Sequence, residues 1–306
     1  MTRLGFVGVG KHAQRMAAAF RECGAEIVAY DRGTDDRCLH ADFGFGRREK
    51  WQTMPLRRDI DAIVCCAPPD VAAQVTRACV VAGKRCCATK PLLVDFDDHE
   101  LQWVADTDDS MLYVDLWRLY SPAWLALKAD LKGREIRSVH VDFYGNGPVR
   151  TTHSGLLDYG PHALAFVLDL GLKPELAWEH RGELGWRNSD RQSAWRYWFG
   201  ASKQVHVCTG NEAEAPEMTV LVCTDAGDFR WSEQEQRQSY GRSGVSGKRN
   251  GSELTCDRDL ALRNFCRAFL AGEPSDTLRI SCEAMRMLQQ AERVASDPLR
   301  EASAVP

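Results

Sequence analysis

The sequence predicts an α/β protein with two regions. Residues 1–120 are expected to form a doubly wound parallel sheet, and residues 121–306 a second α/β region for substrate and oligomer contacts, with a large, open, mostly antiparallel sheet and C-terminal helices that can pack back on the first region. Three observations support this prediction. A glycine-rich turn follows the first apolar run, short buried strands then alternate with helices, and the pattern changes near Ser121-Pro122 to closely spaced strands. Strands alternating with helices are typical of parallel sheets, whereas runs of short strands favour antiparallel ones.

The glycine-rich turn has the pattern G-x-G-x-x-A at residues 8–13. In this pattern Gly8 permits a tight turn from strand to helix, Gly10 lets the backbone touch a pyrophosphate, and Ala13 lets the helix pack closely on the strand. The N-terminus of the following helix offers free N–H groups and the positive end of a dipole to phosphates. The turn therefore predicts a dinucleotide-binding Rossmann domain.

The second predicted strand, residues 26–31, ends in a carboxylate. Asp31 lies about 20 residues beyond the glycines, where a carboxylate accepts hydrogen bonds from the adenosine ribose and repels a 2′-phosphate. This position favours NAD(H). Arg32 leaves NADP(H) possible, because a guanidinium can pair with that phosphate.

The remaining elements of the first region follow in order. Short apolar runs indicate the strands, and amphipathic stretches indicate the helices. Gly, Pro and clusters of polar residues separate these elements. We expect strands at 4–9, 26–31, 61–66, 84–88 and 111–115, helices at 14–23, 67–82 and 95–107, and a polar irregular segment at 36–50.

The second region carries a different pattern. We expect helices at 123–132, 154–170, 257–271 and 281–296, strands at 135–144, 176–181, 193–199, 204–209, 218–224 and 228–234, and a mobile loop of Gly, Ser, Arg and Lys at 238–252. Trp186, Trp195, Trp198 and Trp231 fall among apolar residues of the strands, which favours packing or an oligomer interface over a sugar platform.

The composition is that of an ordinary globular protein, with 44% hydrophobic and 27% charged residues. The net charge of −4 gives no reason to expect nucleic acid or an anionic membrane as partner. The first strand begins almost at residue 1, so no signal peptide is expected, and no apolar run is long enough to span a membrane.

Of the 12 cysteines, Cys65-Cys66 and Cys86-Cys87 are adjacent pairs in apolar stretches. They favour a reducing cytoplasm and inert thiols over a metal site.

Four separated motifs resemble one known family. They are residues 8–13, Ala67-Pro68-Pro69, Thr89-Lys90-Pro91-Leu92 and the segment 155–162, G-L-L-D-Y-G-P-H. Together they resemble the Gfo/Idh/MocA oxidoreductases, named for glucose–fructose oxidoreductase and inositol dehydrogenase. The resemblance implies hydride transfer between a nicotinamide cofactor and a small sugar, polyol or related carbonyl compound. It also implies a homodimer or homotetramer formed through the C-terminal sheet.

Two features depart from the family. Thr89 stands where the usual motif has a glutamate before the lysine, and the stretch from Gly147 to Gly155 is short on the substrate side. The second departure makes the sugar specificity of well-known members a poor guide.

Hydride transfer at a carbinol needs a group that moves a proton at the oxygen. His162 suits this role, because imidazole titrates near neutral pH. Asp158 precedes it by four residues and shares its helix face, where it can orient the imidazole or bind substrate. Lys90 is expected at the carboxyl end of the sheet, where it can reach both cofactor and substrate, and Pro91 biases it towards an extended backbone. These three residues are the predicted catalytic set.

Further residues complete the predicted site. The predicted cofactor-binding residues are Gly8, Gly10, Lys11, His12, Ala13, Asp31, Arg32, Ala67, Pro68, Pro69, Lys90 and Pro91. Weaker substrate candidates are Arg118, Tyr120, His153 and Tyr159, and the last two are alternative proton donors. Two other functions stay open: reduction of a C=N bond in a non-sugar metabolite, and a regulator that senses the dinucleotide without chemistry.

Overall fold

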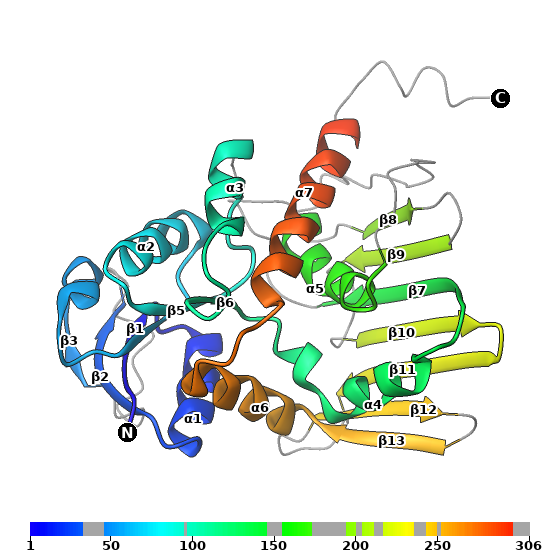
Figure 1. Ribbon diagram of the computed structural model, residues 1–306, viewed down its shortest axis with the longest axis horizontal. Helices are drawn as coiled ribbons and strands as arrows, with labels where there is room; N and C mark the ends of the chain where they lie inside the picture. Colours follow the sequence, from blue (N-terminus) through cyan, green and yellow to red (C-terminus); the bar gives the residue numbers. More distant parts are fainter. Residues whose placement is uncertain are drawn as a thin grey trace. The chain divides into compact units, whose positions relative to one another are not determined.

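A computed structural model describes residues 1–32, 46–94, 97–145, 155–172, 194–199, 204–210, 217–235, 243–249 and 252–295. The chain divides into two compact units (Figure 1). The first comprises Met1–Ser121 and Arg258–Cys282, and the second Pro122–Asp257 and Glu283–Pro306. Residues 258–282 therefore return to the first unit after the chain has passed through the second.

The first unit is built on a six-stranded parallel sheet, sheet A, of order β3-β2-β1-β4-β5-β6. This is the order of a doubly wound sheet. From β1 the chain adds strands on one side as far as β3 and then on the other side from β4 to β6, so the strand order reverses beside β1. Its strands are β1 (Arg3–Val7), β2 (Glu26–Asp31), β3 (Arg47–Arg48), β4 (Ala62–Cys65), β5 (Arg85–Ala88) and β6 (Leu112–Val114). Its helices are α1 (Lys11–Glu22), α2 (Pro69–Val81), α3 (Asp98–Ala105) and α6 (Arg258–Ala271), with 3-10 turns η3 (Trp51–Leu56) and η4 (Trp117–Tyr120).

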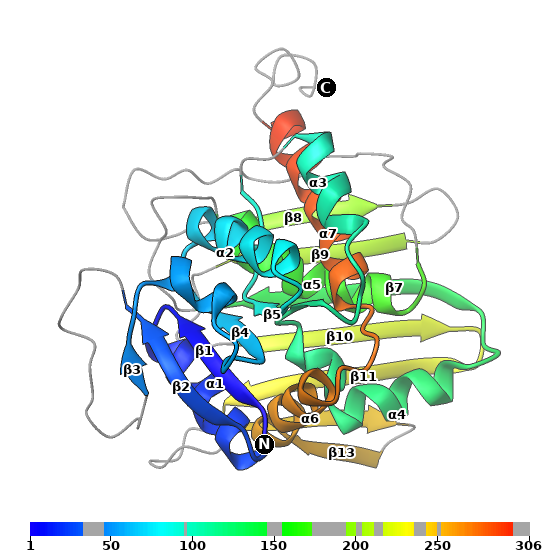
Figure 2. The ribbon, with the colours of Figure 1, turned by 60° about the vertical axis from the view of Figure 1, so that its left-hand side comes forward.

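The two faces of sheet A bury different helices. Cys87 of β5 belongs to a core with α1 and α6, in which Phe20 and Phe269 meet edge to face at 5.6 Å. Cys86, the preceding residue, points to the other face, where Thr76 and Cys79 of α2 contact its thiol. Alternation along a strand explains this division. Helices α1 and α6 lie side by side in both ribbon views (Figure 2).

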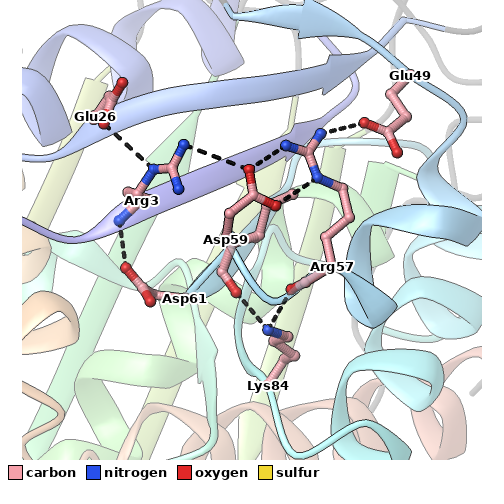
Figure 3. Close-up of polar contacts among 8 residues, drawn as sticks. Arg3, Glu26, Glu49, Arg57, Asp59, Asp61 and Lys84 are labelled. Atoms are coloured by element: carbon pink, nitrogen blue, oxygen red, sulfur yellow. Dashed lines mark hydrogen bonds and ion pairs between the residues drawn. The ribbon is translucent and has the colours of Figure 1, made fainter.

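An ion-pair network closes the amino edge of sheet A (Figure 3). Arg3 of β1 contacts Glu26 at 3.5 Å and Asp59 at 3.4 Å, and Arg57 donates to Asp59 at 2.8 Å. The hydrogen bond from Arg57 lowers the pKa of Asp59 to about 2. Lys84 donates to the backbone carbonyl of Arg57 at 2.7 Å. The charged groups of this edge are therefore paired with other residues of the same chain. Ligands are expected at the opposite, carboxyl edge of the sheet.

The second unit is built on a seven-stranded sheet, sheet B, of order β13-β12-β11-β10-β7-β9-β8. All neighbouring pairs are antiparallel except β7 and β9. Its strands are β7 (Ile136–Tyr144), β8 (Ala194–Phe199), β9 (Gln204–Gly210), β10 (Glu217–Thr224), β11 (Gly227–Glu235), β12 (Ser243–Arg249) and β13 (Ser252–Asp257). Helices α4 (Pro122–Leu131) and α5 (Gly155–Asp169) pack on it, and α7 (Thr277–Ala295) runs from the first unit into the second.

One face of sheet B carries the core of the second unit. Trp231 of β11 is fully buried and packs with Trp124 of α4 at 6.4 Å and Phe166 of α5 at 4.7 Å. Along β7, Val139 and Val141 are buried, whereas the intervening His140 is partly exposed. The sheet thus has one covered face and one more open face, as its alternating pattern predicts.

The fold class and most elements of the described residues agree with the sequence prediction, with two exceptions. The segment 36–50 was expected to be irregular, yet the short strand β3 lies within it. The segment 238–252 was expected to be a mobile loop, yet β12 occupies 243–249 and β13 begins at Ser252. Here a continuous antiparallel ladder, β11 to β12 to β13, outweighs the poor strand propensity of Gly, Ser and Lys. The strand expected at 176–181 and Trp186 lie outside the described residues, and Trp231 packs in the core as expected.

The described part of the chain holds ten free cysteines. Burial raises the pKa of the thiols of Cys66 and Cys87, so they stay protonated. Within the same residues, no group of three or more His, Cys, Asp or Glu side chains could hold a metal ion, and no helix has the length and apolar character needed to cross a membrane.

Candidate active site

The carboxyl edge of sheet A brings five strand ends into one row. Strand pairing aligns Val7 with Asp31 on one side and with Cys65 on the other, and the row continues to Ala88 and Val114. The residues that follow these strand ends are therefore neighbours across the sheet. This edge gathers the glycine turn, Asp31, the loop after β4, the loop of Lys90 and Asp115.

Gly8 makes the turn that begins this edge. Its φ of +81° is a conformation that favours glycine, and a Cβ atom there would lie 2.8 Å from backbone atoms of Cys66 and Ala67. Its N–H donates to the backbone carbonyl of Asp31 at 2.7 Å. The fold itself therefore requires a glycine at position 8, because the backbone after β4 leaves no room for a side chain there.

Gly10 is required by nothing in the described structure. Its φ is −67°, and a Cβ atom there would meet no atom within 4 Å. Gly10 is the N-cap of α1, which has no side-chain cap and no acidic residue in its first turn. Lys11 is exposed in that turn, whereas Ala13 is fully buried against the sheet, as its small size predicts. Within the described residues, the first turn of α1 therefore has N–H groups without a side-chain cap, and Gly10 next to it adjoins open space.

Asp31 is oriented by the protein backbone. The N–H of Trp51, at the start of η3, donates to its Oδ2 at 2.8 Å. This contact fixes the orientation of the carboxylate at the end of β2. Arg32 follows directly at the end of β2. The acid therefore lies beside the glycine turn, at the position where a ribose is bound in this fold.

The loops after β4 and β5 form the next part of the edge. Pro68 is the N-cap of α2 and Pro69 its first residue, so the predicted Ala67-Pro68-Pro69 turn starts a helix at the carboxyl edge. The N–H of Thr89 donates to the carbonyl of Cys65 at 2.9 Å, which joins the two loops. Lys90 is half-buried and precedes Pro91 through a cis peptide bond.

These residues fit a dinucleotide. An uncapped helix N-terminus provides donors for a pyrophosphate, open space at Gly10 lets it approach, and Asp31 provides an acceptor for ribose hydroxyls. The reversal of strand order beside β1 is where doubly wound sheets bind such ligands.

The second unit places the other predicted catalytic residues on α5. Asp158 and His162 lie one turn apart on this helix, and His162 is 9% exposed. Phe143 of β7 packs edge-to-face with His162 at 5.5 Å and with Tyr159 at 5.4 Å. A side chain at Gly145 would collide with the ring of Tyr159. The end of β7 thus holds the imidazole and the phenol by packing.

Two of the weaker substrate candidates, Arg118 and Tyr120, lie on η4. Arg118 is 7% exposed, with its guanidinium 4.4 Å from the centre of the Trp117 ring. Tyr120 packs on Phe265 at 5.3 Å, and its hydroxyl is 2.8 Å from that of Ser275, so its recorded contacts join η4 to the segment around α6. His153 lies outside the described residues.

Sequence reasoning missed Asp115. This acid follows β6 at the carboxyl edge, is buried, and lies 2.5 Å from Nε2 of His12. The signal was present, because Asp115 ends a predicted strand just as Asp31 does. The contact between His12 and Asp115, which are 103 residues apart in the chain, could not be deduced from spacing.

Comparison with known proteins gives the class of this fold. No protein-family profile and no curated protein matches the sequence. Solved structures do match along nearly the whole chain. A protein from Sinorhizobium meliloti 1021 described as a myo-inositol dehydrogenase is 18% identical, with a TM-score of 0.74, covering 96% of this chain and 97% of its own.

Two further structures extend the comparison. KijD10, a 3-ketoreductase from Actinomadura kijaniata in complex with NADP, is 20% identical with a TM-score of 0.71, covering 94% and 96% of the two chains. The biliverdin reductase of Synechocystis sp. PCC 6803, in complex with biliverdin and NADP+, is 16% identical with a TM-score of 0.71, covering 95% and 98%.

The chain thus has the two-domain fold of these three solved proteins. More narrowly, it is the two-domain fold of the Gfo/Idh/MocA type that the sequence motifs predict. The described activities of these three proteins differ, so the shared fold does not specify a substrate.

Proposed function

We propose that this protein is an NAD(P)-dependent oxidoreductase that transfers hydride between a nicotinamide cofactor and a small sugar, polyol or related carbonyl compound. The observation that carries the proposal is the carboxyl edge of sheet A, where Gly8, Gly10, the uncapped N-terminus of α1 and Asp31 converge. The likeness to a myo-inositol dehydrogenase and a 3-ketoreductase supports the substrate class.

In this proposal a bound nicotinamide supplies or accepts the hydride, and the protein moves the proton. His162 gives a proton to, or takes one from, the substrate oxygen, because an imidazole exchanges protons near neutral pH. Asp158 positions the imidazole or a substrate hydroxyl from the same helix face. Lys90 binds the reacting oxygen and the cofactor ribose, and its positive charge stabilises an alkoxide.

We further propose that NAD(H) is preferred over NADP(H). Asp31 supports this preference, since its carboxylate is held by the Trp51 N–H and would repel a 2′-phosphate. Arg32 is the competing feature.

The protein is also proposed to form a homodimer or homotetramer through the more open face of sheet B. Partly exposed residues on that face, including His140, Asp142 and Leu221, support this proposal. Size-exclusion chromatography with light scattering would measure the mass, and a monomer at micromolar concentration would contradict it.

The thiol-rich buried core is consistent with the cytoplasmic location that we propose.

The decisive experiment is a substrate panel. Polyols, sugars, carbonyl compounds and imines would be followed by NADH absorbance, with the His162→Ala variant as control. Turnover of a polyol or carbonyl compound that His162→Ala abolishes supports the proposal. Turnover of imines alone would assign the protein to C=N reduction. NADH binding without turnover of any compound would favour a dinucleotide-sensing regulator.

A further inference from the structure

A hollow lies between the edge strand β3 and the turn η3, and the proposed function does not use it. Its volume is about 420 Å³, and the residues that line this β3–η3 hollow are Arg47, Arg48, Glu49, Lys50, Thr53 and Arg57. Four of them are cations and one is an acid, in a chain whose net charge is −4. The hollow therefore concentrates positive charge in a protein that is acidic overall.

The acid of the hollow already has two partners. The hydroxyl of Thr53 donates to Oε1 of Glu49 at 2.6 Å, and the guanidinium of Arg57 donates to Oε2 (Figure 3). The hydrogen bond from Thr53, together with that from Arg57, lowers the pKa of Glu49. Both carboxylate oxygens thus have a donor within the hollow, and the charges of Glu49 and Arg57 offset each other.

Arg57 is committed to carboxylates, whereas Arg47 and Lys50 are not. Nε of Arg57 also donates to Asp59 at 2.8 Å, within the ion-pair network of the amino edge. The side chains of Arg47 and Lys50 are exposed, and within the described residues neither makes a hydrogen bond or an ion pair. Arg47 acts on Glu49 only at longer range. Two positive charges therefore line the hollow without a bound counter-charge.

The backbone that carries these two cations is held on both sides. The N–H of Glu49, between them, donates to the carbonyl of Tyr30 on β2 at 2.9 Å. The carbonyl of Lys50 accepts the N–H of Thr53 at 3.1 Å. Strand pairing and the first turn of η3 thus fix the spacing between Arg47 and Lys50 before any ligand binds.

The hollow is separate from the row of strand ends that a dinucleotide would use. β3 is the outermost strand of sheet A, two strands away from β1 and its glycine turn. Arg57, on the wall of the hollow, shares Asp59 with Arg3 at the start of β1, so this wall reaches the amino edge of the sheet. A molecule bound here would be a second ligand.

Charges on an edge strand also prevent pairing with another chain. That role needs charged side chains but no hollow of ligand size. The volume here falls within the range of small-molecule sites, about 300–1,000 Å³. Protection of the edge therefore explains the charges of β3 but not their arrangement around this space.

A phosphate monoester is the anion that these groups suit best. It carries a charge of about −1.5 to −2 at pH 7 and three acceptor oxygens. A guanidinium offers it two parallel N–H donors, and an ammonium group adds a point charge. The hollow is larger than a phosphate ion requires, and Thr53 and Glu49 line it with oxygen atoms that can bind hydroxyl groups.

We propose that the β3–η3 hollow binds a small hydroxylated phosphate monoester, such as a sugar or polyol phosphate, with Arg47 and Lys50 holding the phosphate group. This ligand is distinct from the dinucleotide. The inference does not depend on the proposed function, because none of the hollow's residues belongs to the proposed catalytic or cofactor-binding set.

The test is calorimetric titration of the full-length protein with glycerol 3-phosphate at low salt, with and without saturating NADH. We expect a Kd below about 1 mM in both cases. Glycerol, which is uncharged, and dimethyl phosphate, which has a single charge, should bind at least about tenfold more weakly. Added salt should weaken binding, because the two cations are exposed. A wild-type Kd above about 1 mM would overturn the inference.

Arg47→Gln combined with Lys50→Gln removes both cations and should raise the Kd at least about tenfold. The fold should be retained, since both side chains are exposed. The matched control is Arg58→Gln combined with Lys132→Gln, which removes the same charges from exposed positions outside the hollow. It should keep the wild-type Kd. An unchanged Kd in the first double variant, or an equal loss in the control, would overturn the inference.

Two further measurements locate the bound phosphate. Loss of glycerol 3-phosphate binding in Gly10→Val, measured without NADH, would place it at α1. Displacement of glycerol 3-phosphate by NADPH but not by NADH would make the hollow part of the cofactor site. Either result would overturn the inference and leave the proposed function standing. Failure of wild type to bind NADH would instead overturn the proposed function, while binding that depends on Arg47 and Lys50 would still support this inference.

Discussion

The N–H of Gly8 donates a 2.7 Å hydrogen bond to the carbonyl of Asp31. This bond joins the turn that would receive a pyrophosphate to the acid that would receive a ribose. The two groups lie at the ends of adjacent parallel strands, β1 and β2, whose register aligns Val7 with Asp31. The spacing between the two parts of the proposed cofactor site is therefore set by sheet geometry, not by a flexible loop.

The two glycines of the turn should respond differently to substitution. Gly8→Ala places a Cβ against the backbone at a φ of +81°, so we expect a loss of more than about 1 kcal/mol in the free energy of unfolding. Gly10→Val enters open space at the N-cap of α1, so it should cost less stability than Gly8→Ala, with only the loss of a favoured N-cap residue. It should nevertheless raise the Kd for NADH at least about tenfold by blocking the pyrophosphate. Thermal unfolding and calorimetry measure both quantities, and wild-type NADH affinity in Gly10→Val would contradict the site.

Asp31→Ser should relax the cofactor preference. The shorter side chain loses the negative charge that repels a 2′-phosphate. We expect the ratio of the Kd values for NADPH and NADH to fall from above one in wild type towards one in the variant. Equal Kd values for the two cofactors in wild type would refute the proposed preference.

His162→Ala should slow the chemical step and leave cofactor binding nearly intact. General acid–base assistance is worth about 10²–10⁴-fold, so kcat should fall by that factor once a substrate is known. Single-turnover rates separate this effect from product release. Tyr159→Phe, which keeps the ring packed on Phe143, is the matched control. A single-turnover rate within a few-fold of wild type would move the acid–base role to another residue.

Lys90→Ala should reduce both kcat and NADH affinity, because we propose that its ammonium group contacts substrate and cofactor. Lys90→Arg keeps the charge but changes its geometry, so it should recover NADH affinity more than kcat. Steady-state kinetics and calorimetry give the two values. An effect of Lys90→Ala on neither value would show that the loop after β5 is only structural.

Stability should decrease as the pH falls from about 6.5 to about 4. His206 of β9 faces His140 of β7 with ring centres 4.2 Å apart. Burial, and then the charge of His140, lower the pKa of His206 to about 4 from 6.5. Between these values the unfolded chain binds a proton that the folded chain does not, so acid favours unfolding.

The thermal midpoint measured across this pH range tests the pair. His206→Gln cannot titrate and should show a shallower fall than wild type. His140→Gln removes the repulsion and should give an intermediate slope. Identical slopes in wild type and His206→Gln would contradict the assignment.

Short-range patterns in the sequence are enough to predict the local elements of this protein. Strand and helix periodicity, the G-x-G-x-x-A turn and the i, i+4 spacing of Asp158 and His162 involve residues close in the chain, and their geometry follows from backbone sterics and helical repeat. The composition of 243–249 misled for the same reason, because pairing with β11 and β13, not propensity, makes it a strand.

Long-range packing fixes which residues distant in the chain come into contact. The path of the chain after β3 brings the Trp51 N–H to the carboxylate of Asp31, and the packing of α1 on sheet A brings His12 to Asp115. The return of α6 to the first unit, an option that the sequence prediction named, is fixed by the contacts of Phe269 with Phe20 and Tyr113. Such contacts arise from burial of apolar surface that the whole sheet shares, and no pattern within one segment encodes them.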